Sequence, residues 1–387
     1  MKSILPFLLC AIILPELHGQ TVITGREPDH VRVLIAGDTC YGESYQEEYA
    51  RTGGVNILTE KGYNYPVAKL IPLLRAVDFR ILNLETPLTT NHSNMLVGKD
   101  YVHYSDPVKL PQIFGAFTPL AFSLANNHSL DQGVVGLNDT FAALKGAGIE
   151  WFGAGTNLAD ASQPLLKKIQ VGDKTFTLAV FGAFEYRKNY DTDFHFYAGA
   201  DKPGTASIDL PAARQAITQL RKDIPDAFII YFTHWGDNYR WKTPAETNIA
   251  HALREDGVDL VVGAHAHTMQ EVEYDGRGWI FYGVGNFMFN AQGRYVANHI
   301  SPFSLPLVID FSVKDGQLKT GLRVYPTVSD NQITRYQPRF VTETELSAVD
   351  ALLAEKSGWD AASRAAVKRG HDDIGFYLNF LEPKPAR

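Results

Sequence analysis

Short apolar runs rich in β-branched and aromatic residues alternate along this chain with segments of helical spacing, and this alternation most limits the possible folds. The runs cover residues 31–36, 79–84, 120–125, 176–181, 228–232, 258–262 and 279–284. Between them, apolar residues recur three or four positions apart within 134–144, 210–220 and 249–253. Strands that alternate with helices in this way predict an α/β fold.

The pattern changes after about residue 300. Two strand-like runs, 305–313 and 322–325, are joined through a Lys-Asp-Gly turn signal at 314–316. Thr342 and Glu345 form a capping box ahead of a helical pattern. A separate second domain is one interpretation, although no Gly/Ser-rich or Pro-rich linker divides the two parts. We instead expect a main domain and an extension of strands and helices packed on it, covering residues 30–310 and 311–387.

The first residues have the features of a secretory signal peptide. Lys2 is followed by an apolar run over 4–14 and by the small residue Gly19 near a plausible cleavage point. The run is too short to cross a bilayer comfortably, and no later segment is long and apolar enough to do so. We therefore interpret residues 1–20 as a cleaved signal peptide, and expect a periplasmic or secreted protein with no stable membrane anchor.

Charge and cysteine content limit the function further. The chain carries a net charge of −7 and contains no run of Lys or Arg, which argues against a nucleic-acid partner. Cys40 is the one cysteine beyond the signal segment, so we expect no internal disulfide. The fold must then be stabilised by its hydrophobic core.

Several of the apolar runs end directly before a side chain that can bind a metal. These side chains are Asp38, Glu85, Asn127, His234 and His265. Ligands of open α/β sheets bind at the carboxyl ends of the strands. One polar residue at such a position is unremarkable, but several at successive strand ends indicate a shared site.

Each of these residues also has an ordinary structural interpretation. Asp38 could cap a turn or a helix, and Asn127-His128 could form an Asx-turn. A single strand-end histidine such as His234 is more often a hydrogen-bonded structural residue. Glu85 follows an otherwise buried run, and a buried carboxylate needs a partner, for which a metal is one candidate.

The pair His265 and His267, separated by Ala266, favours metal binding most strongly. On a strand, residues two apart share a face, so both imidazoles would point at one site. An incidental pair is the alternative. Carboxylates, an amide and imidazoles suit Mn, Fe or Zn better than Mg, and they suffice for two ions that share a bridging ligand. Two such ions recur in the hydrolysis of phosphate esters, where they activate a water.

Several stretches of the sequence resemble the CapA family of poly-γ-glutamate capsule proteins. The stretches occur in the family's order and are Ala36-Gly37-Asp38, Asn83-Leu84-Glu85, 126–133, 234–237, 263–267 and 282–287. The resemblance extends from about Val31 to Phe289. It implies membership of the calcineurin-like metallophosphoesterase superfamily, with a four-layer α/β/β/α sandwich and a centre of two metal ions.

The resemblance also implies two sets of metal ligands that share Glu85 as the bridging residue. The first set is completed by Asp38 and His267. The second set is completed by Asn127, His234 and His265.

Two further positions bear on catalysis in that family. The resemblance implies that His128 is the acid that contacts the phosphate or the leaving group, with Asp131 orienting it. Cys40 stands two residues after the first aspartate, where the superfamily commonly has a histidine. Its thiolate could ligate Zn or Fe, or the residue could be a buried bystander that leaves the first metal site weakened.

Substrate contacts are expected from residues near these motifs. The segment 186–201 mixes aromatic and charged residues, and Arg187 within it could pair with an anionic substrate. Trp235 and Tyr239 could form a pocket wall beside His234. The alternatives are an ordinary surface loop for Arg187 and core packing for the two aromatic residues.

These features predict an exported metal-dependent hydrolase of the CapA type that acts on a phosphoester or a related anionic bond in the cell envelope. The expected partner is an anionic small molecule or an envelope polymer. The competing hypothesis is a non-catalytic component of capsule or poly-γ-glutamate synthesis or export, in which the metal site binds an anionic polymer. Hydrolysis or transfer at a γ-glutamyl bond would combine the two.

Overall fold

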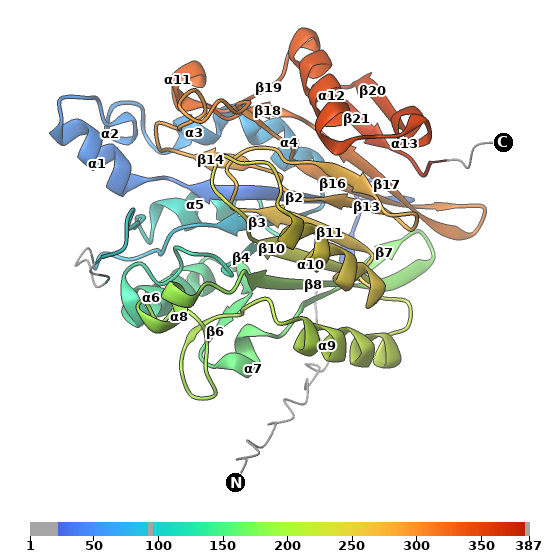
Figure 1. The fold of residues 1–387 in the computed structure, drawn as a ribbon, viewed down its shortest axis with the longest axis horizontal. Helices are drawn as coiled ribbons and strands as arrows, with labels where there is room; N and C mark the ends of the chain where they lie inside the picture. The colour runs from blue at the N-terminus through green and yellow to red at the C-terminus, as the bar shows by residue number, and fades with distance from the viewer. Residues whose placement is uncertain (1–21, 92–95, 97, 384–387) are drawn as a thin grey trace.

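Two large β-sheets packed face to face form the centre of the molecule (Figure 1). The computed structural model describes residues 22–91, 96 and 98–383. The signal peptide expected at 1–20 therefore lies outside the described residues. None of the helices in the described part of the chain is long and apolar enough to cross a membrane.

Seven strands of the described chain make up the first sheet, in the order β1-β7-β8-β10-β11-β13-β12. They are β1 (Ile23–Thr24), β7 (Leu165–Val171), β8 (Lys174–Phe184), β10 (Phe228–His234), β11 (Leu260–Ala264), β13 (Trp279–Phe281) and β12 (Val272–Tyr274). Strands β8, β10, β11 and β13 run parallel, so their carboxyl ends lie at one edge of the sheet.

The second sheet has nine strands within the described residues, in the order β20-β21-β17-β16-β2-β3-β4-β5 with β14 paired to β2. They are β20 (Val367–His371), β21 (Phe376–Phe380), β17 (Gln317–Val324), β16 (Leu307–Lys314), β2 (His30–Cys40), β3 (Phe79–Leu84), β4 (Leu120–Ser123), β5 (Glu150–Phe152) and β14 (Asn286–Phe289). Strands β2 to β5 run parallel. Short strands pair outside the two sheets: β6 (Ala154–Gly155) with β9 (Gly204–Thr205), and β15 (Phe303–Ser304) with β18 (Thr327–Val328) and β19 (Arg339–Phe340).

Strand β2 shows why the apolar runs are nearly continuous rather than alternating. Its residues Val33 and Ile35 belong to the core between the two sheets, whereas Leu34 and Ala36 belong to the core on the outer face. Successive side chains of a strand point to opposite faces, so a strand covered on both faces needs apolar residues at every position.

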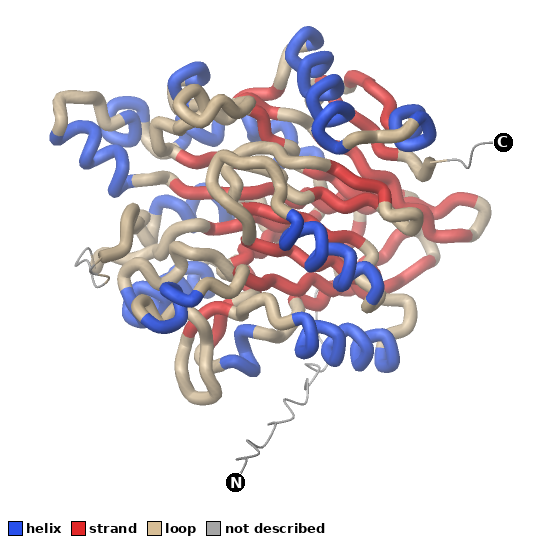
Figure 2. The backbone as a smooth tube through the Cα atoms, in the orientation of Figure 1, coloured by secondary structure: helices blue, strands red, loops and turns tan. Residues whose placement is uncertain are grey.

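Helices cover the outer faces of both sheets, and Figure 2 shows the strands enclosed between them. The face of the nine-stranded sheet is covered by α4 (Ile71–Ala76), α5 (Lys109–Gly115) and α6 (Gly133–Gly146). The face of the seven-stranded sheet is covered by α9 (Leu210–Asp223) and α10 (Pro244–Glu255). The layers therefore follow the order α/β/β/α, which confirms the expected fold class.

The remaining helices are short or peripheral. They are α1 (Glu43–Arg51), α2 (Ile57–Lys61), α3 (Asn64–Val67), the 3₁₀ helix η1 (Ala68–Leu70), α7 (Leu158–Ala161), α8 (Lys188–Thr192), α11 (Asn331–Thr334), α12 (Glu343–Ser357) and α13 (Ala361–Ala366). Helix α12 begins at the expected capping box, in which Thr342 and Glu345 bond each other's backbone N–H groups.

The C-terminal strands continue the second sheet rather than forming a sheet of their own. Strand β16 pairs antiparallel with β2, and β17 follows it through Asp315 and Gly316, both in the left-handed region at φ 53° and 70°. This is the two-residue hairpin that the Asp-Gly signal predicts. The expected boundary between residues 310 and 311 falls within β16. The division into two domains stays a prediction.

Candidate metal centre

The polar residues that follow the apolar runs meet where the carboxyl ends of strands from both sheets come together. Asp38 lies in β2 and Glu85 directly follows β3, both in the nine-stranded sheet. His234 ends β10 and His265 follows β11, both in the seven-stranded sheet. Asn127 lies in the turn beyond β4. The structure therefore brings together side chains that are distant in sequence.

A local irregularity of β2 places Asp38. The pairing of β2 with β3 shifts its register between Ala36 and Asp38. A Cβ at Gly37 would lie 1.9 Å from the Gly285 carbonyl oxygen, so only glycine allows this close approach. The Asp38 carboxylate then accepts a bond from Asn83 Nδ2 at 2.9 Å, and from the His265 backbone N–H at 3.3 Å. The second bond ties the two sheets together at the site.

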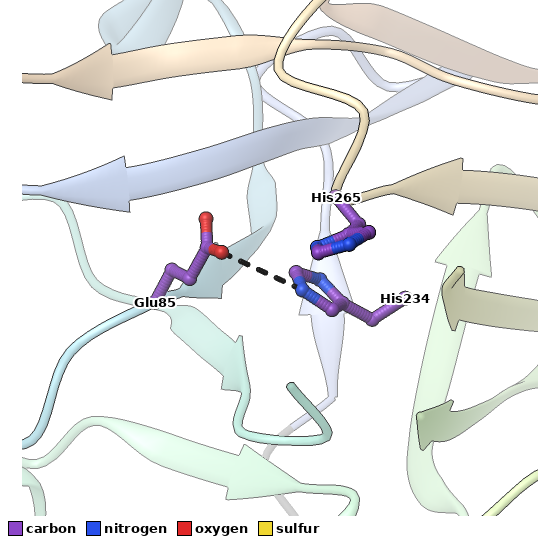
Figure 3. Close-up of side chains that lie close together, drawn as sticks. All are labelled: Glu85, His234 and His265. Atoms are coloured by element: carbon purple, nitrogen blue, oxygen red, sulfur yellow. Dashed lines mark ion pairs between the residues drawn. The ribbon is translucent and has the colours of Figure 1, made fainter. Parts of the chain in front are cut away.

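Glu85, His234 and His265 form the first group of side chains that could hold a metal ion. His234 Nε2 lies 3.5 Å from Glu85 Oε1, and the ring centres of His234 and His265 lie 4.6 Å apart. Figure 3 shows the two histidine rings side by side, with the Glu85 carboxylate facing the ring of His234. The Asn127 Oδ1 atom lies only 2.6 Å from the same Nε2. Asn127 therefore joins this group, which we call the imidazole group.

Asp38, Glu85 and His267 form a second candidate group, which we call the carboxylate group. His267 Nδ1 lies 3.2 Å from Asp38 Oδ2 and 3.9 Å from Glu85 Oε2. The Asn286 Oδ1 atom lies 2.9 Å from this nitrogen. Asn286 was part of a recognised sequence motif but was not predicted to join the site. Glu85 belongs to both groups, as the bridging position requires.

The two histidines that follow β11 reach the site in a different way from the predicted one. Strand β11 ends at Ala264, so neither histidine lies on a strand. His265 and His267 have φ values of 92° and 58°, a region that residues other than glycine rarely adopt. The prediction that both share one strand face is wrong. Their rings instead diverge, with His265 in the imidazole group and His267 in the carboxylate group.

The protonation states of the site follow from its burial. Burial and the charge of Asp38 raise the pKa of Glu85 well above its usual range. Burial lowers the pKa of His234 to about 3 and that of His265 well below its usual range. Burial acts to raise the pKa of Asp38, but His267, His234 and Asn83 together outweigh it and the net shift is downward. The two imidazoles of the first group are therefore neutral, the form that ligates metals.

The donor set fits a divalent transition metal. Glu85 is fully buried, and neither of its carboxylate oxygens has a hydrogen-bond partner in the described structure. The buried Nδ1 atom of His265 also lacks one there. Leaving such groups without partners costs several kcal/mol, and a metal ion would satisfy them together. Oxygen and imidazole ligands suit Mn, Fe or Zn.

His128 lies against this centre and is held by a buried ion pair. Its Nδ1 atom lies 2.6 Å from Asp131 Oδ2, and its Nε2 atom lies 3.9 Å from Glu85. The Lys99 ammonium is 2.8 Å from Asp131 Oδ1 and 3.2 Å from His128 Nδ1. Burial and Lys99 lower the pKa of His128 well below its usual range. Asp131 therefore contacts the His128 ring directly, and the catalytic role that the family resemblance implies for this pair stays a prediction.

Sequence reasoning missed two buried neighbours of His128. No motif surrounds Lys99 in the sequence, and His103 does not follow a predicted strand. The centre of the His103 ring lies 3.7 Å from that of the His128 ring, with the two rings tilted by 36°, and His103, His128 and Asp131 form a third candidate group. The Lys99 ammonium already neutralises Asp131 there. Lysine is rarely buried without a partner, so the one available signal for Lys99 was a carboxylate that could pair with it.

Cys40 is buried and does not belong to any group of potential metal ligands among the described residues. Burial raises the pKa of its thiol well above the usual range, which keeps the sulfur protonated. Its Sγ atom accepts a hydrogen bond from the Gly42 backbone N–H at 3.2 Å. The structure thus favours the bystander interpretation over thiolate ligation.

A cleft of about 310 Å³ opens onto the centre, and His128 and His267 line it. Tyr239 also lines this cleft, and its ring lies 5.4 Å from that of His267. Trp235 does not, contrary to the expectation of a pocket wall. It is fully buried in the core beneath α9 and α10, where its indole N–H donates to the Tyr282 carbonyl at 2.8 Å. Core packing, the alternative, applies to Trp235.

Arg187 lies beside the imidazole group but is engaged within the protein. Its guanidinium pairs with Glu185 at 3.1 Å and donates to the Gly236 carbonyl. It is absent from the residues that line the cleft. Arg187 therefore binds the loop after His234 in this structure. Its contact with a substrate stays a prediction.

Fold and site together define a class: a four-layer α/β/β/α protein whose strand ends carry buried His, Asp and Glu groups that could hold a metal ion. Within that class the chain belongs to the bacterial capsule synthesis protein family PGA_cap, whose family model matches residues 32–291. The matched region contains every residue of the imidazole and carboxylate groups.

Sequence relatives agree with this family. The chain is 28% identical to the capsule biosynthesis protein CapA of Bacillus anthracis over 73% of its own length and 66% of that protein, just under two thirds. It is 30% identical to a probable polyglutamine synthesis accessory protein of Mycobacterium tuberculosis, over 69% of its own length and 76% of that protein.

Solved structures give a weaker likeness. A phosphatase from Mycoplasma pneumoniae matches with a TM-score of 0.35 and 12% identity, over 80% of this chain and 97% of that one. This TM-score is too low to establish a shared fold. The fold is defined by the chain's own topology.

Proposed function

We propose that this capsule-synthesis family protein is an exported metal-dependent hydrolase that acts on a phosphoester or a related anionic bond in the cell envelope. The observation that carries the proposal is Glu85. A fully buried carboxylate with no hydrogen-bond partner in the described structure, between the imidazole and carboxylate groups, is explained by a bridge between two metal ions. Export rests on the signal-peptide features of residues 1–20.

Each of the two groups would bind one of the two ions of such a hydrolase. Asn127, His234 and His265 would hold one divalent ion, Asp38 and His267 the other, and Glu85 both. Bound Mn, Zn or Fe ions would supply the polarisation of a phosphoryl group and the activation of a water.

His128 is the residue placed to handle the leaving group. It lines the cleft, and its Nδ1 atom is held by Asp131 at 2.6 Å, so its Nε2 atom faces Glu85 and the metal groups. From this position its imidazole can contact a phosphoryl oxygen or the departing oxygen, and it can donate a proton only after taking one up, because its lowered pKa leaves it neutral. Lys99 and Asp131 fix the ring orientation through buried contacts.

The proposal is tested by metal analysis and by activity. The purified protein, prepared without chelator, should contain bound transition metal and hydrolyse generic phosphomonoesters or phosphodiesters with added Mn or Zn. Glu85→Ala and His265→Ala should abolish the activity. His251→Ala is the matched control, because His251 lies on α10 and pairs with Glu273 away from the centre. Absence of metal from the wild type would refute the site.

A second candidate function is non-catalytic binding of an anionic polymer such as poly-γ-glutamate. Two observations favour it: the relatives carry names of biosynthesis and accessory proteins, and Cys40 does not complete the carboxylate group. A protein that holds metal but turns over no phosphoester and no γ-glutamyl amide would support this role over the hydrolase.

A further inference from the structure

One arginine in the cleft stands between two tyrosine rings. The guanidinium of Arg294 lies 5.2 Å from the ring centre of Tyr101 and 5.3 Å from that of Tyr239. It also donates a hydrogen bond to the Tyr101 hydroxyl at 3.3 Å. All three residues line the cleft that opens onto His128 and His267. The rings keep the planar guanidinium in one orientation, which lowers the entropy cost of using it as a donor.

Both tyrosines hold an unfavourable backbone conformation. Tyr101 has a φ of 56° and Tyr239 a φ of 57°. Bulky residues in the left-handed region cost roughly 1–3 kcal/mol each and persist where the surrounding structure enforces them, commonly at ligand sites. Tyr101 is also 53% exposed, so burial of its own ring does not explain its position.

The charge of Arg294 is not neutralised by the protein. It forms no ion pair with any carboxylate in the described part of the chain, whereas Arg187 near the centre is paired with Glu185. Among the residues that line the cleft, Arg294 is the one lysine or arginine. Tyr239 links it to the centre, because the same ring lies 5.4 Å from His267.

We propose that Arg294, held between Tyr101 and Tyr239, binds a second anionic group of a ligand whose first anionic group lies at the His128 and His267 end of the cleft. The preferred ligand is therefore a compound with two or more carboxylates or phosphates along a chain, and not a compact ester with one charge. A guanidinium can donate two parallel bonds to either oxyanion. The position of the first anionic group rests on the proposed function; the role of Arg294 does not require turnover.

Calorimetric binding to the metal-loaded full chain tests this inference with two pairs of probes. Tri-γ-glutamate is compared with the same peptide whose α-carboxylates are converted to amides. Propane-1,3-diyl bisphosphate is compared with propyl phosphate, and all measurements are made at constant ionic strength. The wild type should bind the multiply charged probe of at least one pair about 10-fold more tightly than its partner, equivalent to about 1.4 kcal/mol. The pair that shows the preference identifies the oxyanion as carboxylate or phosphate.

Arg294→Ala should remove this preference. Arg294→Lys should retain only part of it, because an ammonium cannot donate two parallel hydrogen bonds to one oxyanion as a guanidinium does. Tyr101→Leu should weaken the preference while keeping the charge. Arg277→Ala is the control, since it deletes an exposed arginine whose partner is Asp275 and which does not line the cleft. No preference in the wild type, or a preference kept by Arg294→Ala, would overturn the inference.

The two proposals fail separately. A protein without hydrolytic activity that still shows the Arg294-dependent preference refutes the hydrolase and supports this inference. An active hydrolase with equal affinity for both members of each pair does the reverse. An equal loss in Arg277→Ala would show that only overall charge matters, which also contradicts the role of Arg294.

Discussion

The imidazole group and the carboxylate group share Glu85 but differ in chemistry. The imidazole group adds two neutral histidines and the amide oxygen of Asn127, which lies 2.6 Å from His234. The carboxylate group adds Asp38 and a single histidine, His267. Imidazole ligands select transition metals, whereas oxygen ligands accept harder ions. The same set of strand ends therefore offers two metal positions with different ligands. We expect the imidazole group to bind its ion more tightly than the carboxylate group.

The largest effect is expected from substituting Glu85, the residue that both groups share. Glu85→Gln should lower the content of both ions, because an amide is a poorer bridge than a carboxylate, and should reduce hydrolysis to background. Metal analysis and phosphoester assays measure this. In chelator-treated protein the same change should raise the melting temperature. The pKa of Glu85 is raised in the folded protein, so the metal-free fold loses stability as pH rises above the pKa that Glu85 has in the unfolded chain. Glutamine at this position carries no charge and avoids that loss. Retention of both ions would contradict the bridging role.

Single-ligand variants then separate the groups. His265→Ala should lower the metal affinity of the imidazole group by at least about 100-fold, since loss of an outer-shell partner alone costs roughly 10- to 100-fold. His267→Ala should affect the carboxylate group instead and spare the tighter ion. Metal titration under competition with a chelator distinguishes the two. Identical behaviour of both variants would show that the groups act as one indivisible site.

The pH dependence of stability sharpens the same contrast through His234. Its pKa is lowered to about 3 in the folded, metal-free protein, against about 6.5 in the unfolded chain. Between these values the unfolded chain binds the extra proton, so stability is lost as pH falls, by up to about 1.4 kcal/mol per pH unit. Urea unfolding across this range should show a shallower slope in His234→Asn. His251→Asn, which replaces a half-buried histidine of α10 outside the centre, is the control.

The smallest expected effect concerns Cys40. Cys40→Ala should leave the metal content and activity of both groups unchanged, because the buried protonated thiol belongs to neither. A small loss of stability, about 1 kcal/mol, is expected from the cavity left in the core. Denaturant unfolding and metal analysis measure the two properties. Loss of an ion from this variant would show that Cys40 ligates after all.

Several elements were predictable because their residues respond to local rules. The run 79–84 is β3 (Phe79–Leu84) itself, and the Asp-Gly signal gave the β16–β17 hairpin. The sequence does not predict helix α1 (Glu43–Arg51), because its residues are mostly polar and its buried side chains are Glu43 and Gln46 rather than apolar ones. Lys99 and His103 were missed because the loop after β3 has no periodicity, and only the folded chain brings them to His128.

The sequence by itself determined the α/β character of this protein and the identity of the residues at its strand ends. Strand patterns are local, and the carboxyl ends of parallel strands meet at one edge. Only the tertiary structure decided how those residues divide into two groups, that Trp235 lies in the core, and that Arg294 faces the cleft. The reason is physical: distances between side chains of the two sheets depend on sheet packing and on the left-handed backbone at His265 and His267, which no sequence period encodes.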